Sequence, residues 1–288
     1  MTDASSALEF TGERFTPECV REIWYEHYHR YAFALSLAEG KRVLDAACGE
    51  GYGSALLARC ARHVLGVDIS IEAISHANKR YAAQQENLSF RQADVAALDA
   101  LPSASFDLIC SFETLEHLQA QEAMLAGFRR LLAPGGVLLV STPDRHNYSD
   151  VPGFKNEHHV RELYRPEFEA MLATEFREVR LYAHKLAFQS LLWSLDGGRD
   201  SFMALTLDAQ TRVTQGFDYA PLYYIAACSN DPLPRLPALS MFGDQAESVY
   251  AHYYHEIRKN MSAGTRIQQL EAELDAALSR LRALESAP

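Results

Sequence analysis

The sequence lacks the features that mark several classes of protein. No run of apolar residues is long enough to span a bilayer, and no basic segment precedes an apolar one near the N-terminus. We therefore expect neither a membrane-spanning segment nor a secretory signal peptide. Lys and Arg number 27 against 38 Asp and Glu, a formal net charge of −11, and they form no cluster. Because nucleic-acid binding depends on clustered positive charge, we expect no nucleic-acid partner.

Cysteine is also scarce, and the few cysteines have no CxxC spacing. They are Cys19, Cys48, Cys60, Cys110 and Cys228. Three of them lie in or beside apolar runs, where buried free thiols are expected. A reducing compartment fits this usage, and we expect a cytoplasmic protein.

What the sequence does contain is an alternation of short apolar runs with helical patterns. The runs are "RVLDAA", "HVLGVDIS", "LSFRQADV", "FDLICSF" and "GVLLVST", and the helical stretches between them cover 53–61, 71–84 and 118–132. The runs show no strict alternation of apolar and polar residues, which is typical of strands buried on both faces. This order predicts an α/β fold with an open, mostly parallel sheet and helices on both faces. Ligands bind such sheets beyond the carboxyl ends of the strands.

Segments before and after this core complete the expected organisation. Residues 21–39 place Trp24, Tyr28, Tyr31 and Leu35 on one helical face, and Gly40 follows as a stop. We assign residues 1–40 to an N-terminal lid and helix, and residues 41–230 to the core domain. Within that domain we expect a polar loop over 144–165, a helix from Pro166 to about Ala173, strands over 176–186 and 221–229, and an insert over 188–220.

The C-terminal part reads as a linker followed by helices. Residues 231–244 contain three prolines and are assigned to a linker, and residues 245–288 to a helical tail with helices over 245–261 and 265–285. In the second helix, the apolar positions have the 3,4 spacing of a coiled-coil seam: Ile267, Leu270, Leu274, Ala277, Leu281 and Leu284. The tail therefore predicts a homodimer or docking onto a partner, and self-association is the use that we expect.

A glycine-rich turn joins the first strand to the following helix in "VLDAACGEGYGSALLA", residues 43–58. Such a turn brings backbone N–H groups close to a ligand, either a dinucleotide pyrophosphate or the methionine portion of S-adenosylmethionine. The dinucleotide pattern requires a third small residue where Ser54 stands, and Asp45 at the strand end would repel a pyrophosphate. S-adenosylmethionine carries a sulfonium and an ammonium, so Asp45 favours this ligand.

Two further carboxylates follow the next two strands. Asp68 ends the second strand, where a carboxylate can accept both ribose hydroxyls, and Ile69 is placed to lie against adenine. Asp94 ends the third strand, in position to accept from the adenine amino group, with Val95 as its apolar neighbour. A tight turn with no ligand would explain the glycines, but it does not explain three acids at three successive strand ends.

The ordered set "VLDAACGEGYG", "GVDIS", "ADV", "FDLICSFETLEHL" and "LLAPGGVLLVSTP" resembles the class I, Rossmann-like S-adenosylmethionine-dependent methyltransferases over roughly residues 40–230. The resemblance implies a seven-stranded sheet whose last strand is antiparallel, with S-adenosylmethionine as cofactor and S-adenosylhomocysteine as product. It also implies cofactor contacts from Asp45, Gly49, Gly51, Asp68, Asp94 and the region of Phe112. Ala47 stands where the family pattern D-x-G-x-G-x-G has its first glycine, a small change that should not block binding.

The candidates for catalysis follow the fourth and fifth strands. Methyl transfer is an in-line displacement in which alignment contributes up to roughly 7 to 11 kcal/mol. A hydroxyl acceptor must also lose a proton, and a base adds roughly 10² to 10⁴ in rate. We expect His117 in "ETLEHL" to act as this base, with Glu113 or Glu116 orienting it or sharing the role. The alternative is that Glu116 and His117 only begin the next helix.

A second candidate group is "NEHHVREL", with His158 and His159 in the loop expected to cover the acceptor. A histidine pair raises the question of a metal, but no third ligand at fitting spacing and no paired acids are evident, so we expect no metal site. We expect a solvated or substrate-facing loop, and place His159 with Glu116 and His117 among the catalytic candidates.

The N-terminal segments "FTGERFTPE" and "EHYHRY" resemble those of methyltransferases of bacterial cell-surface polysaccharide synthesis. There they would form a lid in which Arg14 meets the cofactor carboxylate and His27 or Tyr31 lines the pocket, although core packing explains most of the aromatic residues. The function expected is O-methylation of a sugar or glycan-linked hydroxyl. Two alternatives stay open. One is a quinone or phenol O-methyltransferase, which "ETLEHL" also resembles, and the other is a cofactor-binding scaffold without turnover.

Overall fold

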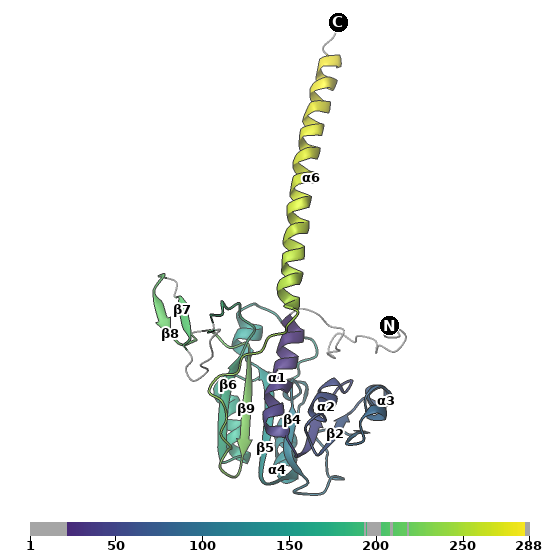
Figure 1. Cartoon of the computed structure of the whole chain (residues 1–288), viewed down its shortest axis with the longest axis vertical. Coiled ribbons are helices and arrows are strands. Elements are labelled where there is room, and N and C mark those ends of the chain that lie inside the picture. The colour runs from purple at the N-terminus through teal and green to yellow at the C-terminus, as the bar shows by residue number, and fades with distance from the viewer. Residues whose placement is uncertain (1–21, 193, 195–202, 208–209, 218, 286–288) are drawn as a thin grey trace. The chain divides into compact units, whose positions relative to one another are not determined.

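In the computed structural model, the chain is described over residues 22–192, 194, 203–207, 210–217 and 219–285. Its centre is a seven-stranded sheet in the order β3-β2-β1-β4-β5-β9-β6 (Figure 1). The strands are β1 (Arg42–Ala46), β2 (His63–Asp68), β3 (Leu88–Gln92), β4 (Phe106–Ser111), β5 (Leu132–Pro143), β6 (Glu178–His184) and β9 (Tyr223–Ser229). The first five run parallel, and β9 is antiparallel to both β5 and β6. The predicted fold class is confirmed.

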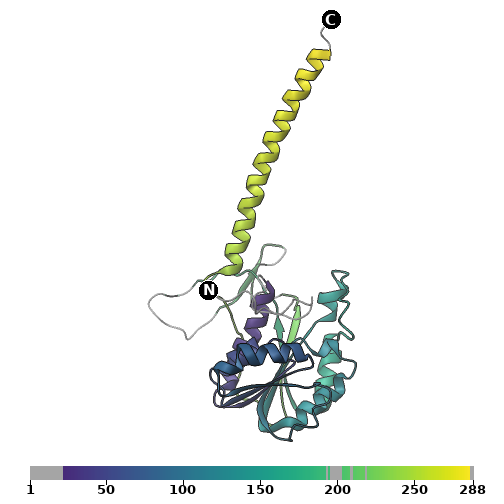
Figure 2. The ribbon, with the colours of Figure 1, turned by 90° about the vertical axis from the view of Figure 1, so that its right-hand side faces the viewer.

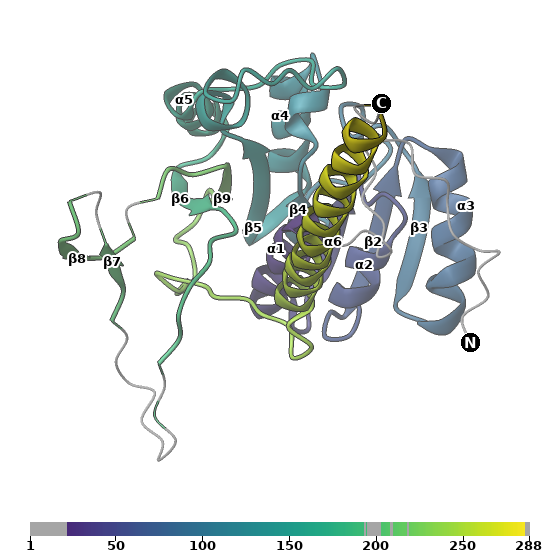
Figure 3. The same ribbon diagram turned by 90° about the horizontal axis from the view of Figure 1, so that it is seen from above.

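Helices cover both faces of this sheet, as Figure 3 shows from above. The helices of the core are α1 (Glu22–Ala38), α2 (Tyr52–Leu57), α3 (Ile71–Arg80), α4 (Gln121–Leu131) and α5 (Arg165–Glu175). Successive strand residues point to opposite faces. Val43 and Leu108 thus pack with α1, α2 and α3, whereas Leu44 and Ile109 pack with α4 and α5. This double burial explains why the strands have no polar face in the sequence.

The helix boundaries differ from the sequence prediction where polar turns interrupt a helical pattern. The helix expected over 118–132 begins at Gln121 as α4, and a separate one-turn 3₁₀ helix, η3 (Leu115–His117), precedes it. The stretch 71–84 is divided into α3 and η2 (Ala82–Gln84), and the helix over 53–61 ends at Leu57. The polar loop after β5 contains the short helical segment η4 (His146–Asp150), and the described part of the insert contains a hairpin, β7 (Leu205–Leu207) and β8 (Val213–Gln215).

The C-terminal tail is one helix, α6 (Ser248–Glu285), and not the two that were expected (Figures 1 and 2). Ser262 and Thr265 stand on either side of Gly264, the residue near the expected break. Their hydroxyls donate to the backbone carbonyls of Arg258 and Met261, one turn earlier, so polar side chains bond along the helix here instead of ending it. Residues 23–241 form one compact unit, and residues 242–288 belong to a second. No helix in the described part of the chain is both long and apolar enough to cross a membrane.

Candidate active site

The glycine turn after β1 leaves the strand through three residues with left-handed backbone. Ala47, Gly49 and Gly51 have φ angles of 60°, 56° and 95°. A Cβ atom at Gly51 would lie 2.7 Å from the Phe90 ring and 2.8 Å from the Ala77 Cβ, so only glycine fits there. Ala47 adopts the same left-handed region at a cost of about 1 kcal/mol. The pattern that the sequence resembles has glycine at this position, which agrees with the left-handed backbone of Ala47.

Asp68, at the end of β2, is joined to this turn by its carboxylate. One oxygen accepts from the Gly49 N–H and the other from the Ser70 N–H, both at 2.9 Å, and the residue is only 9% exposed. Each carboxylate oxygen has two lone pairs, so each retains one for a further donor. Two remaining acceptors side by side suit the two neighbouring hydroxyls of a ribose.

The other residues expected to contact the adenosine part surround the same edge of the sheet. Ile69 follows Asp68 and is 67% exposed, which leaves an apolar side chain available to a flat ring. Asp94 follows β3, is exposed, and accepts from the Ala96 N–H at 2.8 Å. Val95 and Phe112 are buried instead, and Phe112 packs edge-on against Tyr31 with ring centroids 5.1 Å apart.

Asp45 lies deeper in the protein than Asp68 and Asp94, with 1% of its surface exposed. Its carboxylate accepts from the Tyr31 hydroxyl at 3.0 Å and from the Ser54 hydroxyl at 2.5 Å. Burial raises the pKa of Asp45 to about 6, although these two hydrogen bonds act in the opposite direction. Asp45 therefore ties α1 and α2 to β1, and its predicted contact with the cofactor stays a prediction. Tyr31 is buried, in agreement with the core-packing interpretation of the aromatic helix.

Arg30 on α1 is a charged residue of this region that the sequence analysis missed. It is 1% exposed, its Nη2 lies 3.4 Å from Glu113 Oε1, and its guanidinium stacks 4.6 Å from the centre of the Tyr223 ring. None of its three guanidinium nitrogens has a hydrogen-bond partner among the described residues. A positively charged residue within the mostly apolar helical pattern of 21–39 is the sequence feature from which it could have been identified. The other predicted arginine, Arg14, lies outside the described residues.

Glu113 and Glu116 follow β4 and face the end of β5. Glu113 has left-handed backbone, with φ of 51°, and accepts from the Ser141 hydroxyl at 2.6 Å. Glu116 is 1% exposed and accepts from the Thr142 hydroxyl at 3.1 Å. Burial, followed by the charge of Glu113, raises the pKa of Glu116 well above its usual range. Strained backbone beside buried carboxylates is typical of functional sites.

His117 and His159 meet above these acids from two different elements. Their rings pack edge-on with centroids 5.0 Å apart, and His117 Nε2 lies 3.9 Å from Glu116 Oε1. The loop is held in place by the backbone, because the Val160 and Arg161 N–H groups donate to the Glu116 carbonyl at 2.8 and 3.0 Å. The three predicted catalytic residues are thus brought together, while the side chain of His158 is exposed.

Each of these two histidines has a defined tautomer. Nδ1 of His117 lies 3.1 Å from the His158 carbonyl oxygen, which can only accept, so Nδ1 carries the proton. Nδ1 of His159 donates to the Glu162 carboxylate at 2.5 Å. In the neutral form of each ring Nε2 therefore bears the lone pair, and at His159 it accepts from the Asn156 side-chain amide at 3.0 Å. Burial lowers the pKa of His159, which favours the neutral ring.

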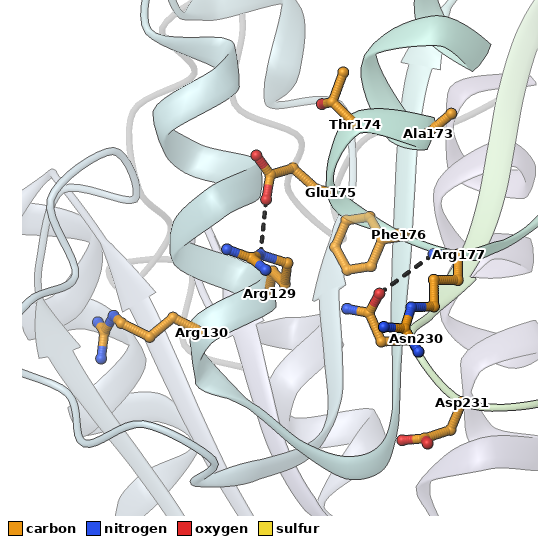
Figure 4. A pocket seen from close by; sticks show the side chains of 9 residues that line it. All are labelled: Arg129, Arg130, Ala173, Thr174, Glu175, Phe176, Arg177, Asn230 and Asp231. Atoms are coloured by element: carbon orange, nitrogen blue, oxygen red, sulfur yellow. Dashed lines mark hydrogen bonds and ion pairs between the residues drawn. The ribbon is translucent and has the colours of Figure 1, made fainter.

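A pocket of about 950 Å³ lies at the opposite edge of the sheet (Figure 4). It is lined by the ends of α4 and α5, including Arg129 and Glu175, which pair at 2.8 Å, and by Asn230 and Asp231 after β9. These residues lie at the amino ends of β5 and β6, whereas ligands of parallel sheets bind at the carboxyl ends. We therefore place the active site at the edge that carries Asp68, Glu116 and His159.

The chain resembles known proteins over its core. A family model described as "Methyltransferase domain" matches residues 37–194. A probable S-adenosylmethionine-dependent methyltransferase of Mycolicibacterium smegmatis is 38% identical over 179 residues, which cover 60% of this chain and 67% of that protein. A ubiquinone biosynthesis O-methyltransferase of Psychrobacter arcticus is 36% identical over 121 residues, covering 41% of this chain and 46% of the relative, or less than half its length.

The fold also matches a solved structure. The YcgJ protein of Bacillus subtilis aligns with a TM-score of 0.52 at 16% identity, and the alignment covers 72% of this chain and all of that protein. At this identity the match concerns the arrangement of helices and strands alone.

Proposed function

The chain belongs to the class I S-adenosylmethionine-dependent methyltransferases, and on this premise we propose that it methylates a hydroxyl of a sugar or glycan-linked acceptor in cell-surface polysaccharide biosynthesis. The observation that carries the proposal is the pairing of two groups at one edge of the sheet. Asp68 and the glycine turn face the cofactor side, while Glu116, His117 and His159 gather after β4 and β5. The first group suits the cofactor, and the second suits an acceptor that must lose a proton.

The residues present fit S-adenosylmethionine. Asp68 offers its two remaining lone pairs to the ribose hydroxyls, and Ile69 and Asp94 offer an apolar surface and an acceptor to adenine. The left-handed turn at Ala47 to Gly51 leads into the N-terminus of α2, whose dipole favours a carboxylate. When bound, this cofactor supplies a methyl group that its sulfonium activates for displacement.

Arg30 takes the carboxylate of the cofactor in this proposal. A buried guanidinium without hydrogen bonds is costly, and a carboxylate is the partner that matches its planar donors. Glu113 neutralises the charge of Arg30 at 3.4 Å without donating or accepting a hydrogen bond to it. This assignment gives Arg30 the role that the sequence predicts for Arg14.

The acceptor hydroxyl loses its proton as the new C–O bond forms. The cluster of Glu116, His117 and His159 offers the groups for this step, and His117 is the base that the sequence predicts. Its Nδ1 proton is held by the His158 carbonyl, which leaves the Nε2 lone pair as the basic atom. Such a base contributes roughly 10² to 10⁴ in rate.

Three features support a sugar acceptor. The loop over 144–165 that reaches the cluster is polar and contains His146, Asn147, Asn156 and His158. The N-terminal segments resemble those of polysaccharide-modifying methyltransferases, and the helical tail provides a means of joining an assembly. The free thiols at Cys48, Cys60, Cys110 and Cys228 support the cytoplasmic location that we also propose.

The experiment is an acceptor screen with isotopically labelled S-adenosylmethionine and mass analysis of the products. One panel contains nucleotide sugars and short glycans, and the other contains catechols and demethylated quinones. We expect methyl transfer to the first panel alone and a loss of about 10² or more in kcat for His117→Gln. Transfer to the second panel alone would contradict the sugar assignment. Cofactor binding without transfer to either panel would favour the scaffold without turnover.

A quinone or phenol acceptor is a second candidate because of the insert. Its described residues expose large apolar side chains, with Phe188 at 75% and Leu191 at 60%. Such a surface could cover an apolar acceptor. One relative of this chain is named a ubiquinone biosynthesis O-methyltransferase, which also favours this candidate. The second panel of the screen tests this candidate directly.

The tail is proposed to join two copies of the chain. On α6, the described seam residues Ile267, Leu270, Leu274 and Leu281 are 46 to 59% exposed. Seam residues of a coiled coil are buried only by a partner helix. A second copy supplies the same seam, so no other protein is needed to cover it.

A further inference from the structure

We propose that Glu116, His117 and His159 bind a divalent transition metal ion between the end of β4 and the loop after β5. One ligand atom from each of the three lies within 4.8 Å of the other two. One carboxylate and two imidazoles form the ligand set of catalytic zinc sites and of sites for other first-row metals with open coordination positions. Imidazole ligands favour such metals over magnesium. The role of the ion in the reaction rests on the proposed function, whereas its binding does not.

The orientation of both histidines fits metal binding. A ligating histidine presents the lone pair of one nitrogen to the metal and donates from the other to a carbonyl or carboxylate. His117 donates from Nδ1 to the His158 carbonyl, and His159 donates from Nδ1 to the Glu162 carboxylate. Both rings therefore hold the protonation state that a metal at Nε2 requires, and Glu162 fixes the orientation of the His159 ring.

The charges around the site also favour a cation. Glu26, Glu113 and Glu116 are buried or nearly so, and among the described residues Arg30 is the one guanidinium whose charge acts on all three of them. If all three were ionised, their charge would exceed that of one guanidinium, and burial disfavours such an excess in the absence of a further cation. A divalent ion beside Glu116 supplies the missing positive charge.

Small side-chain movements would bring the three ligand atoms to the distances that a metal ion requires. Zinc ligands lie at about 2.0 to 2.2 Å from the ion, and hence about 3.4 Å apart in a tetrahedron. His117 Nε2 and Glu116 Oε1 are already 3.9 Å apart, so rotation of the side chains is enough. At His159 the metal must replace the Asn156 amide, which lies 3.0 Å from Nε2. Asn156 is in the same loop and needs only to turn its side chain away.

The metal gives the cluster a different role from that of a single base. The acceptor hydroxyl binds at an open position, where the ion lowers its pKa and its proton passes to water. The oxygen electron pair then forms the C–O bond while the C–S bond breaks and its pair remains on sulfur. An alcohol and S-adenosylmethionine thus give the methyl ether, S-adenosylhomocysteine and one proton. His117 acts as a ligand in this scheme, and the ion replaces it in activating the hydroxyl.

The proposal departs from the sequence-based expectation of no metal site for a structural reason. In the sequence, the pair at 158 and 159 has no third ligand at fitting spacing. In the structure, only His159 of that pair belongs to the cluster. The other two ligands, Glu116 and His117, come from η3, which lies about 40 residues earlier along the chain.

The test is metal binding by tag-free, metal-depleted protein without acceptor or cofactor. Calorimetry with Zn²⁺ and the visible absorption of Co²⁺ give the stoichiometry and ligand geometry. We expect one ion per chain, binding at least about 100-fold weaker for Glu116→Gln and His159→Gln, and about 10- to 100-fold weaker for Glu162→Gln. His158→Gln is the matched control in the same loop and should bind the ion as the wild type does.

Three outcomes overturn the proposal: absence of stoichiometric binding to the wild type, equal binding by Glu116→Gln and His159→Gln, or an equal loss in His158→Gln. Binding of S-adenosylhomocysteine is measured on every variant to show that each is folded. The same measurement separates the two proposals. If the wild type binds the metal but not S-adenosylhomocysteine, the metal site is supported and the proposed function is contradicted.

Discussion

The guanidinium of Arg30 is buried and makes no hydrogen bond among the described residues. We therefore expect a ligand to supply its hydrogen-bond partner. We predict that Arg30→Gln weakens S-adenosylhomocysteine binding about 10- to 100-fold, the value of a hydrogen bond to a charged group. Binding of 5′-methylthioadenosine, which lacks the carboxylate, should be unchanged. Calorimetry with both ligands measures this, and an equal loss for both would show a general disturbance of the site instead.

Asp45 gives a pH-dependent prediction. Burial raises its pKa from 3.8 to about 6, so between these values the folded protein binds a proton that the unfolded chain releases. The sign follows: this carboxyl lowers the free energy of unfolding as the pH rises from about 4 through about 6. Asp45→Asn removes the effect, so the variant should gain about 2 to 3 kcal/mol relative to wild type between about pH 4 and about pH 7.5.

Urea unfolding of both proteins at the two pH values measures this relative gain. Other buried groups titrate equally in the wild type and the variant and cancel in the comparison. The exposed Asp99→Asn is the matched control and should follow the wild type at both pH values. Parallel profiles for wild type and Asp45→Asn would contradict the assignment.

The sequence located the strand ends that carry Asp68 and Asp94, because a carboxylate that ends a strand is visible as a local pattern. It placed Asp68 and Asp94 correctly at the carboxyl ends of β2 and β3. It could not show that Asp45 turns inward to Tyr31, or that Arg30 lies beside Glu113, because these contacts join distant parts of the chain. The approach of His159 to His117 is of the same kind.

At the scale of elements, the packing of α1 against α2 depends on Gly53 of α2. The Tyr31 ring lies over Gly53, where a Cβ would be 2.0 Å from the ring carbon Cζ. We predict that Gly53→Ala destabilises the protein by about 2 kcal/mol or more, since Tyr31 must move and lose its bond to Asp45.

Gly127→Ala is the matched control for this prediction. Gly127 lies within α4 and has no atom within 4 Å of the position of its Cβ, so alanine should stabilise by about 0.4 to 1 kcal/mol. Urea unfolding measures both variants. Equal effects of the two substitutions would show that the contact with Tyr31 is not tight.

The strands were easier to predict than the helix ends. The strands β1, β2, β4 and β9 are short apolar runs that are mostly buried, so periodicity and length suffice to predict them. The start of α4 was misplaced because η3 already turns helically at Leu115, and nothing in "ETLEHL" marks the interruption before Gln121. The sequence predicted a break near Gly264, whereas α6 continues through it. The hydroxyls of Ser262 and Thr265 donate to carbonyls one turn earlier, and this bonding along the helix was not evident from the sequence.

At the scale of the whole molecule, self-association is the property that α6 predicts. We expect the wild type to sediment as a dimer, and Leu274→Lys with Leu281→Lys to sediment as a single chain, because charges cannot be buried in the seam. Gln268→Lys on the same helix is the control and should leave the mass unchanged. A wild type that sediments as a single chain would contradict self-association and favour docking onto another protein.

The central claim is that this chain binds S-adenosylmethionine at the edge of the sheet that carries Asp68. Its most direct test is calorimetric titration of the wild type and Asp68→Ala with S-adenosylmethionine, S-adenosylhomocysteine and NAD. The account predicts that the first two bind the wild type, that Asp68→Ala loses at least about 10-fold in affinity for both, and that NAD does not bind. Binding of NAD alone, or equal binding of S-adenosylmethionine by wild type and variant, would contradict it.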